Sequence, residues 1–172
     1  MSGDGRSAAQ TIGPFFEFAL PWPDGAHAAA AGTPGAVWIE GRLLDGAGDP
    51  IDDGLIETWQ LGPPGIRGFA RSATDAEGRY AILTVKPGPI AGGGGMKHAP
   101  HLAVSVFARG LLKRAATRIY FADEAAANAA DPTLMIVGDD AARATLIATP
   151  GARGYLFDIR MQGRGATVFF DV

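Results

Sequence analysis

Cysteine is absent from the 172-residue sequence, and no apolar run approaches the roughly 18 residues that a membrane-spanning helix needs. Without cysteine, the chain has neither a disulfide framework nor a thiolate metal ligand. Residues 1–10 are small and polar and lack the apolar segment of a signal peptide. These absences favour a soluble, cytoplasmic protein.

The sequence also contains few positively charged residues. Fifteen Lys and Arg residues are outnumbered by 18 acidic ones, and the net charge of −3 argues against a nucleic-acid-binding surface. The one basic cluster consists of Arg109, Lys113, Arg114 and Arg118 and spans a predicted hairpin. For Lys113 and Arg114 we favour the ordinary interpretation, a solvated face of the hairpin.

The sequence does contain a regular series of short apolar and β-branched runs from Val37 onward, separated by Gly-, Asp- and Pro-rich turn clusters. This spacing is typical of an all-β fold, a two-sheet antiparallel β-sandwich. The expected strands are residues 37–44, 55–61, 79–85, 101–108, 116–121, 144–149, 155–161 and 166–172.

One short helix is expected, over residues 121–132. Asp123 is suited to cap its start, a run of good helix formers follows, and Pro132 is expected to end it.

The residues before Val37 have a different character. Residues 26–36 show neither strand nor helix periodicity, and residues 10–25 combine aromatic side chains with three prolines. Such an apolar segment is expected to pack on its own sandwich or on a second chain. We therefore expect one β-sandwich domain, residues 37–172, preceded by an extended N-terminal arm and irregular connection, residues 1–36, that contacts a partner chain.

Three histidines were considered as metal ligands. On a strand, two histidines aim at one metal when they are two residues apart, but His98 and His101 are three apart and Pro100 stands between them. Ala103, which would complete an H-x-H pair with His101, has no donor atom. His27 lies in the irregular connection and is expected at the surface. The ligand count therefore argues against a metal site in this chain.

Glu57 is a second candidate for chemistry. It shares a strand face with Leu55 and Trp59, which predicts a partly buried carboxylate in need of a donor. A structural ion pair or hydrogen bond is the favoured interpretation. No serine stands beside a histidine in a nucleophile elbow, so the residues alone describe a β-sandwich without an active site.

Six segments nevertheless occur in a specific order: QTIGPFF at 10–16, LIETWQ at 55–60, TVKPG at 84–88, APHLAVSVFARG at 99–110, TRIYFADEAAANAADPTL at 117–134 and FDIRMQGRGATVFFDV at 157–172. In order and spacing they resemble the intradiol ring-cleaving dioxygenases over nearly the whole chain.

The resemblance implies a particular kind of subunit. In the two-chain members of this family, a beta chain binds a non-haem ferric ion through two tyrosines and two histidines. The matching positions here are Ile90 after KPGP, then His101 and Ala103; the second tyrosine belongs in residues 61–72, which contain none. Three of the four ligands are thus missing. The resemblance implies that this chain binds no metal and that Fe(III) belongs to a homologous partner, the iron-binding beta subunit.

The resemblance also implies that this chain contributes to the partner's substrate pocket. The residues carried over are Thr11, Gly13 and Pro14 in the TIGP segment, and Arg109 in FARG. A glycine followed by a proline lets backbone approach a ligand and fixes its direction, and a guanidinium suits a substrate carboxylate. Eight strand residues place Arg109 roughly 26 Å from His101, so it would serve a pocket at the other end of the strand.

The implied activity is cleavage of protocatechuate with O2 to 3-carboxy-cis,cis-muconate, an intradiol reaction of the beta-ketoadipate pathway for aromatic catabolism. The chain alone is expected to be inactive and to work in a hetero-oligomer of alpha–beta pairs, away from nucleic acids and membranes. The alternative from another class is a non-enzymatic, prealbumin-like β-sandwich that serves as a binding or structural module. A self-sufficient iron dioxygenase is disfavoured because Tyr80, Tyr120 and Tyr155 fall inside predicted strands.

Overall fold

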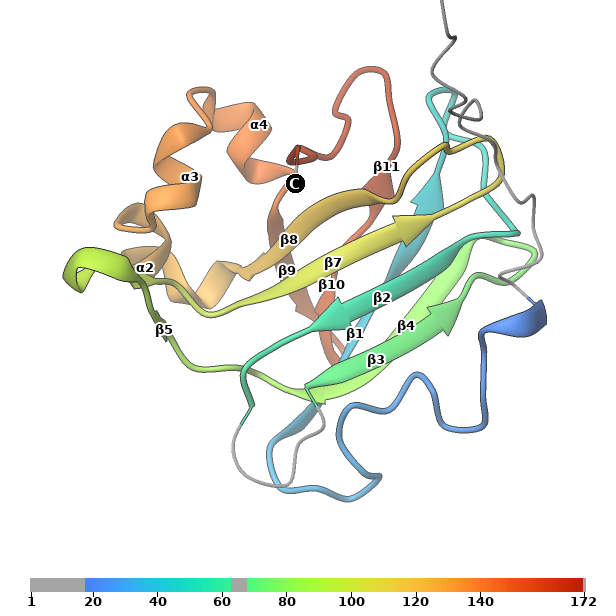
Figure 1. Ribbon diagram of the computed structural model, residues 1–172, viewed down its shortest axis with the longest axis horizontal. Coiled ribbons are helices and arrows are strands. Elements are labelled where there is room, and N and C mark those ends of the chain that lie inside the picture. Colours follow the sequence, from blue (N-terminus) through green and yellow to red (C-terminus); the bar gives the residue numbers. More distant parts are fainter. Residues whose placement is uncertain (1–17, 63–67, 172) are drawn as a thin grey trace, which may run out of the picture.

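The computed structural model describes residues 18–62 and 68–171 (Figure 1). Thr11, Gly13 and Pro14 lie outside the described residues. The strands are β1 (Ala36–Leu44), β2 (Leu55–Trp59), β3 (Phe69–Ala73), β4 (Arg79–Val85), β5 (Ile90–Ala91), β6 (Lys97–His98), β7 (His101–Phe107), β8 (Ala115–Phe121), β9 (Ile147–Gly151), β10 (Gly154–Leu156) and β11 (Ile159–Arg160). The helical segments are η1 (Gly93–Gly95), η2 (Ala122–Glu124), α2 (Ala125–Ala129), α3 (Pro132–Ile136) and α4 (Asp140–Ala144).

The expected mostly-β fold is confirmed, but two separate sheets are not clearly present. Nine strands form one sheet: eight follow the path β11-β1-β10-β9-β8-β7-β2-β3, and β4 lies off this path, paired to β1. β3, at one end of this path, and β4, which pairs with β1 near the other end, are consecutive strands that lie side by side, and the Ala81 N–H donates to Ser72 Oγ across them at 3.3 Å. The sheet is therefore nearly closed and barrel-like, which a strand pattern along one chain does not distinguish from a sandwich.

The expectation of a purely antiparallel sheet is wrong. β1 pairs with β10 and β11 in parallel, and β8 pairs with β9 in parallel. A parallel pair needs a long connection between its strands. Helices α2, α3 and α4 supply that connection between β8 and β9, and they lie together at one end of the molecule (Figure 1).

The expectation of one helix capped by Asp123 and ended by Pro132 is also wrong. Pro132 is the first residue of α3, a position where its missing N–H costs nothing. Asp131 caps that helix by accepting hydrogen bonds from the N–H groups of Thr133 and Leu134. Asp123 caps no helix and instead accepts from the Lys86 ammonium at 2.7 Å.

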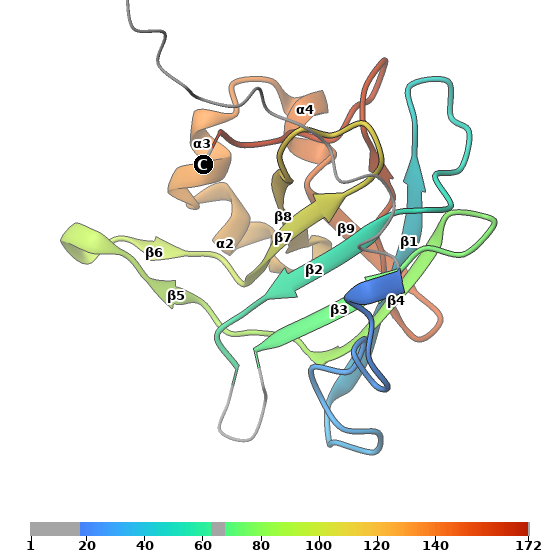
Figure 2. The same cartoon turned by 45° about the vertical axis from the view of Figure 1, so that its right-hand side comes forward.

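Two differences concern strands. β3 and the β5–β6 hairpin, which projects from one end of the molecule (Figure 2), were not expected from the sequence. The expected strand 166–172 forms only an isolated bridge between Phe170 and Ala116 among its described residues. Side-chain hydroxyl groups form hydrogen bonds with its backbone: Thr117 Oγ1 donates to the carbonyl oxygen of Val168, and the Val168 N–H donates to Thr145 Oγ1. These bonds take the place of a ladder.

The main core lies inside the curved sheet. Its fully buried members come from strands on all sides and include Ile39, Leu43, Ile56, Ile82, Leu102, Val106, Ile119 and Phe121. A smaller cluster beneath the helices contains Ala99, Tyr120, Leu134 and Leu146. Burial of these apolar groups from both clusters is the main favourable contribution to folding.

The described part of the N-terminal arm packs on the chain's own sheet. Leu83 in β4 exchanges backbone hydrogen bonds with the segment around His27, and the adjacent Ala28 and Ala29 are buried. Nearer the N-terminus, the Trp22 ring stacks on Phe69 at a centroid distance of 5.9 Å. Among the described residues, no helix has the length and apolar character needed to cross a membrane.

Candidate functional site

One outer face of the sheet carries two of the predicted site positions, His101 and Ala103. In the ladders of β2, β7 and β8, Trp59 pairs with Ala103 and Ala103 with Arg118. His101 pairs with Tyr120 at the next same-face position of β7. Because paired residues share a face and side chains alternate along a strand, all five side chains lie on the same side, away from the main core.

The prediction that His98 and His101 diverge is wrong. Their ring centroids lie 6.0 Å apart, edge to face. Strand alternation does not relate them because β6 ends at His98 and β7 begins at His101, with Ala99 and Pro100 between the two strands. The buried carboxylate of Asp131, distant in sequence, accepts a hydrogen bond from the Ala99 N–H at 2.9 Å and helps to set this bend.

Burial favours the neutral form of His101. Its ring is buried, and burial lowers the pKa of His101 below the ordinary value of 6.5; the nearby Arg118 charge lowers it further. Nδ1 donates to the Ala99 carbonyl oxygen at 2.7 Å. The imidazole therefore acts here as a buried, hydrogen-bonded group that fixes the bend.

Asp131 is the polar centre of this region. Its side chain is fully buried and accepts hydrogen bonds from Tyr120 OH and from the N–H groups of Ala99, Thr133 and Leu134. Burial alone would raise the pKa of Asp131, but these donors outweigh it and the pKa is lowered. Beyond the Asp131-Pro132 pair, no sequence pattern indicates this role.

The residues at the positions that the resemblance assigns to metal ligands do not fit a ferric ion. Ile90 in β5 pairs with His98 in β6, and Ala103 is an exposed residue of β7. Neither side chain has a donor atom, which leaves His101 alone of the three. Across residues 18–62 and 68–171, no three His, Cys, Asp or Glu side chains come together in a way that could hold a metal ion.

The predicted structural ion pair of Glu57 is confirmed. Its partner is Arg71, directly opposite on β3, whose Nε donates to Glu57 Oε1 at 2.8 Å. The two side chains are 13% and 17% exposed. Arg71 also stacks over the Trp22 ring at 5.0 Å and donates to the Leu20 carbonyl oxygen, so the same guanidinium fastens the N-terminal arm.

Arg109 follows the end of β7, away from the His101 end of the strand. Its guanidinium is 68% exposed and lies beside two acids, with Nε 3.3 Å from Asp53 Oδ2 and an Nη 3.9 Å from Asp52 Oδ1. The arrangement leaves a large part of the cation open to solvent or to a ligand.

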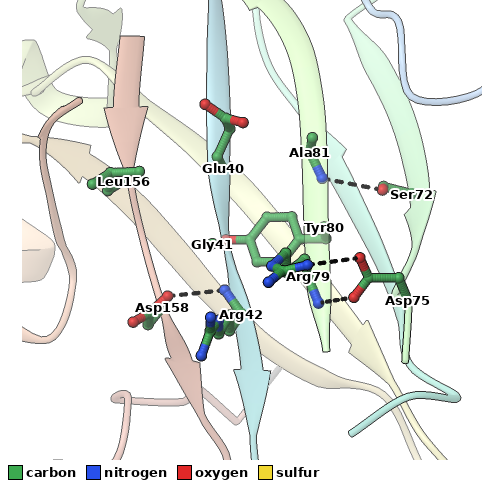
Figure 3. A pocket seen from close by; sticks show the side chains of 10 residues that line it. All are labelled: Glu40, Gly41, Arg42, Ser72, Asp75, Arg79, Tyr80, Ala81, Leu156 and Asp158. Atoms are coloured by element: carbon green, nitrogen blue, oxygen red, sulfur yellow. Dashed lines mark hydrogen bonds and ion pairs between the residues drawn. The ribbon is translucent and has the colours of Figure 1, made fainter. Parts of the chain in front are cut away.

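A hollow of about 450 Å³ lies over β1 and β4 (Figure 3). Several of its polar groups are already engaged: the backbone N–H of Arg42 donates to Asp158, and Arg79 lies beside Asp75. The Tyr80 hydroxyl points into the protein and donates to the Phe157 carbonyl oxygen at 2.7 Å. These groups are therefore engaged in structural contacts.

No family model matches the sequence. A Burkholderia cepacia protein, the protocatechuate 3,4-dioxygenase alpha chain, is 40% identical, and the alignment covers 97% of this chain and 98% of the relative. The chain belongs to the family of protocatechuate 3,4-dioxygenase alpha chains. The resemblance drawn from the sequence motifs is thereby confirmed.

Two further similarities bear on this family. The protocatechuate 3,4-dioxygenase beta chain of Burkholderia cepacia is 33% identical over 75% of this chain and 65% of its own length, so the alpha-chain family is homologous to beta chains. Among solved structures, the dioxygenase domain of a dioxygenase and carbohydrate-binding protein fusion from Streptomyces sp. SirexAA-E matches with a TM-score of 0.58. That match covers 80% of this chain and 87% of the other at 21% identity, and it supports the fold.

Proposed function

We propose that this chain is the alpha, non-iron-binding subunit of a protocatechuate 3,4-dioxygenase and completes the active site of an iron-bearing beta subunit. The observation that carries the proposal is the alignment with an alpha chain over almost the full length of both proteins. The activity is intradiol cleavage of protocatechuate with O2 to 3-carboxy-cis,cis-muconate in the cytoplasm.

The lack of donor atoms at the family's metal positions supports a division of labour. Ile90 and Ala103 provide no ligand, and the remaining His101 has its Nδ1 engaged with the Ala99 carbonyl oxygen. Iron and the oxygen chemistry therefore belong to the beta subunit, and this chain alone is inactive. A homologous beta-chain relative supports an assembly of alpha–beta pairs.

This chain contributes charge and pocket wall. Arg109, open on one side and held by Asp53 on the other, binds the substrate carboxylate and orients the ring. Thr11, Gly13 and Pro14 belong to the arm, residues 1–36, which reaches the partner, where backbone at Gly13 can approach the substrate closely. Neither contribution requires a proton transfer by this chain.

Expression of the chain with and without a beta chain tests the proposal. The isolated chain is expected to carry no stoichiometric iron, to show no visible tyrosinate-to-iron band and to consume no O2 with protocatechuate. Co-expression with the beta chain is expected to give a complex with one iron per pair and ring-cleaving activity. Stoichiometric iron with turnover in the isolated chain would refute the accessory role.

The non-enzymatic alternative, a prealbumin-like binding or structural module, is not favoured because the relatives are dioxygenase chains along almost the whole sequence. If the complex forms but is no more active than the beta chain alone, the result would support this non-enzymatic alternative.

A further inference from the structure

A second hollow, of about 480 Å³, opens on the face of the sheet that carries Ala103. We call it the outer-face pocket. Strands β2, β7 and β8, helix α3 and the segment around Phe170 supply its lining. It lies at the position where Ala103 replaces the second histidine of the family's H-x-H pair.

Small side chains create the floor of the outer-face pocket. Ala103 and Ser105 stand two apart on β7, and Ala116 on β8 is the ladder partner of Ser105. Three small groups side by side on one face leave a depression in the sheet. Larger residues surround it.

Two arginines of the basic cluster line this depression. Arg114 donates from Nη1 to Ser105 Oγ at 2.7 Å, and Arg118 donates from Nη1 to Thr133 Oγ1 at 3.0 Å. These neutral partners fix the guanidinium groups without neutralising them. Arg114 is exposed, as the interpretation of a solvated face expects, and its guanidinium is in addition hydrogen-bonded at the hollow.

The carboxylates around the pocket are committed to other partners. Asp171, which also lines the pocket, pairs with Lys113 at 2.6 Å, and Glu57 pairs with Arg71. Asp131 reaches Arg118 only through Tyr120 OH. Among the described residues, neither Arg114 nor Arg118 forms an ion pair, so the pocket has two cations and free N–H donors for an external anion.

The remaining walls are aromatic. Trp59, which is largely exposed, lies beside the pocket on β2, and Phe170 lies on the side of the C-terminal segment. Two cations beside two aromatic side chains suit a planar ring that carries a carboxylate. The volume is adequate for one such molecule.

We infer that the outer-face pocket, with Arg114 and Arg118 as anion-binding groups, is a second, non-catalytic site in this chain for a small aromatic carboxylate. The inference borrows from the proposed function only its choice of probe, protocatechuate. The ligand meets no iron there and is held without being converted.

The test is a count of bound protocatechuate in the alpha–beta complex by equilibrium dialysis without O2, so that bound substrate is not consumed. We expect two molecules per pair, one at the partner's iron site and one here. The paired change Arg114→Gln and Arg118→Gln should reduce the count to one, with at least about a tenfold loss of affinity at the second site. Turnover in air should be unchanged because neither arginine belongs to the catalytic pocket.

Controls separate this site from the substrate pocket. Ala103→Leu fills the hollow without changing charge or any hydrogen bond, and it should also reduce the count to one. Arg109→Ala should instead weaken the other site.

One molecule per pair in the unaltered complex would overturn the inference, whether the pocket is empty or covered by an acidic side chain of the partner. Two molecules that survive both the arginine and the Ala103 changes would overturn it as well. If the unaltered complex binds two molecules per pair but does not convert protocatechuate, the result would contradict the proposed function and not this site.

Discussion

Arg109 and Asp53 form an ion pair in which the acid is buried and the base is exposed. Asp53 is 7% exposed, Arg109 is 68% exposed, and Nε lies 3.3 Å from Oδ2. No described residue donates an aligned hydrogen bond to the Asp53 carboxylate, so the contact is ionic. The buried acid anchors one edge of the guanidinium and leaves its other edge facing outward.

This arrangement predicts a substrate-selective effect of Arg109→Ala in the alpha–beta complex. The KM for protocatechuate should rise about tenfold or more, because a charge-assisted contact with the carboxylate is lost. The KM for catechol, which lacks the carboxylate, should change much less. Steady-state kinetics with both substrates checks this. Arg79→Ala removes a similarly exposed arginine beside two acids and is the matched control; equal effects of Arg109→Ala on both substrates would rule out the charge role.

The same pair predicts a stability effect that can be separated from the kinetic one. Arg109→Ala leaves the buried Asp53 carboxylate without its cation and should lower the free energy of unfolding by about 1 kcal/mol, since solvent already screens much of the pair. Adding Asp53→Asn removes the unpaired charge and should recover most of that loss. Urea unfolding of the unaltered chain, of Arg109→Ala and of the double variant measures these differences in the free energy of unfolding. A double variant less stable than Arg109→Ala would show that Asp53 has another partner.

Local sequence patterns correctly predicted side-chain positions that depend on the geometry of a single strand. Alternation along residues 55–61 placed Glu57 in a half-buried setting that required a cation, and Arg71 supplies it. Alternation also placed His101 and Ala103 on one face, as the ladder to β8 shows. These predictions depend on backbone geometry over a few residues, which the sequence encodes directly.

Patterns failed where distant segments decide the structure. His98 and His101 meet because the chain bends at Ala99, and Asp131 holds that bend from across the fold. The parallel pairing of β1 with β10 joins strands from opposite ends of the chain. The outer-face pocket likewise depends on the register of β7 with β8, which brings Ser105 opposite Ala116. None of these contacts leaves a periodic signal along the sequence.

Arg71→Met should destabilise the fold and loosen the arm. Glu57 would become a largely buried carboxylate without a partner, at a cost of about 2 kcal/mol. The arm would also lose the contact of Arg71 with the Trp22 ring. We expect a lower urea midpoint and faster proteolysis near residues 18–25. Arg79→Met, which breaks only exposed ion pairs, should shift the midpoint little; an equal shift in both variants would contradict the importance of burial.

The lowered pKa of Asp131 predicts how the free energy of unfolding changes at acid pH. Its folded pKa lies below the ordinary value of 3.8, so its carboxylate stabilises the fold above that pH, and the contribution is lost as the pH falls through the folded pKa. Asp131→Asn should cost about 2 kcal/mol near neutrality and flatten the decline in unfolding free energy below about pH 5. Chemical denaturation from neutral to acid pH measures both. Asp171→Asn, at an ion pair that is exposed and screened by solvent, should change the slope much less. A parallel decline for the unaltered chain and Asp131→Asn would contradict the lowered pKa.

Replacing the two donor-free residues should not create an iron centre. Ile90→Tyr together with Ala103→His restores two donors beside His101, yet residues 61–72 still contain no tyrosine to act as the fourth ligand. Arg118 stands opposite position 103 in the ladder, and its positive charge opposes a bound cation there. We expect the double variant, expressed without a beta chain, to carry no stoichiometric iron, to lack the visible band and to consume no O2 with protocatechuate. Adding Arg118→Gln controls for the charge and should improve metal retention at most slightly. Iron-dependent turnover by the double variant would mean that this chain supplies a ligand from a position we have not assigned.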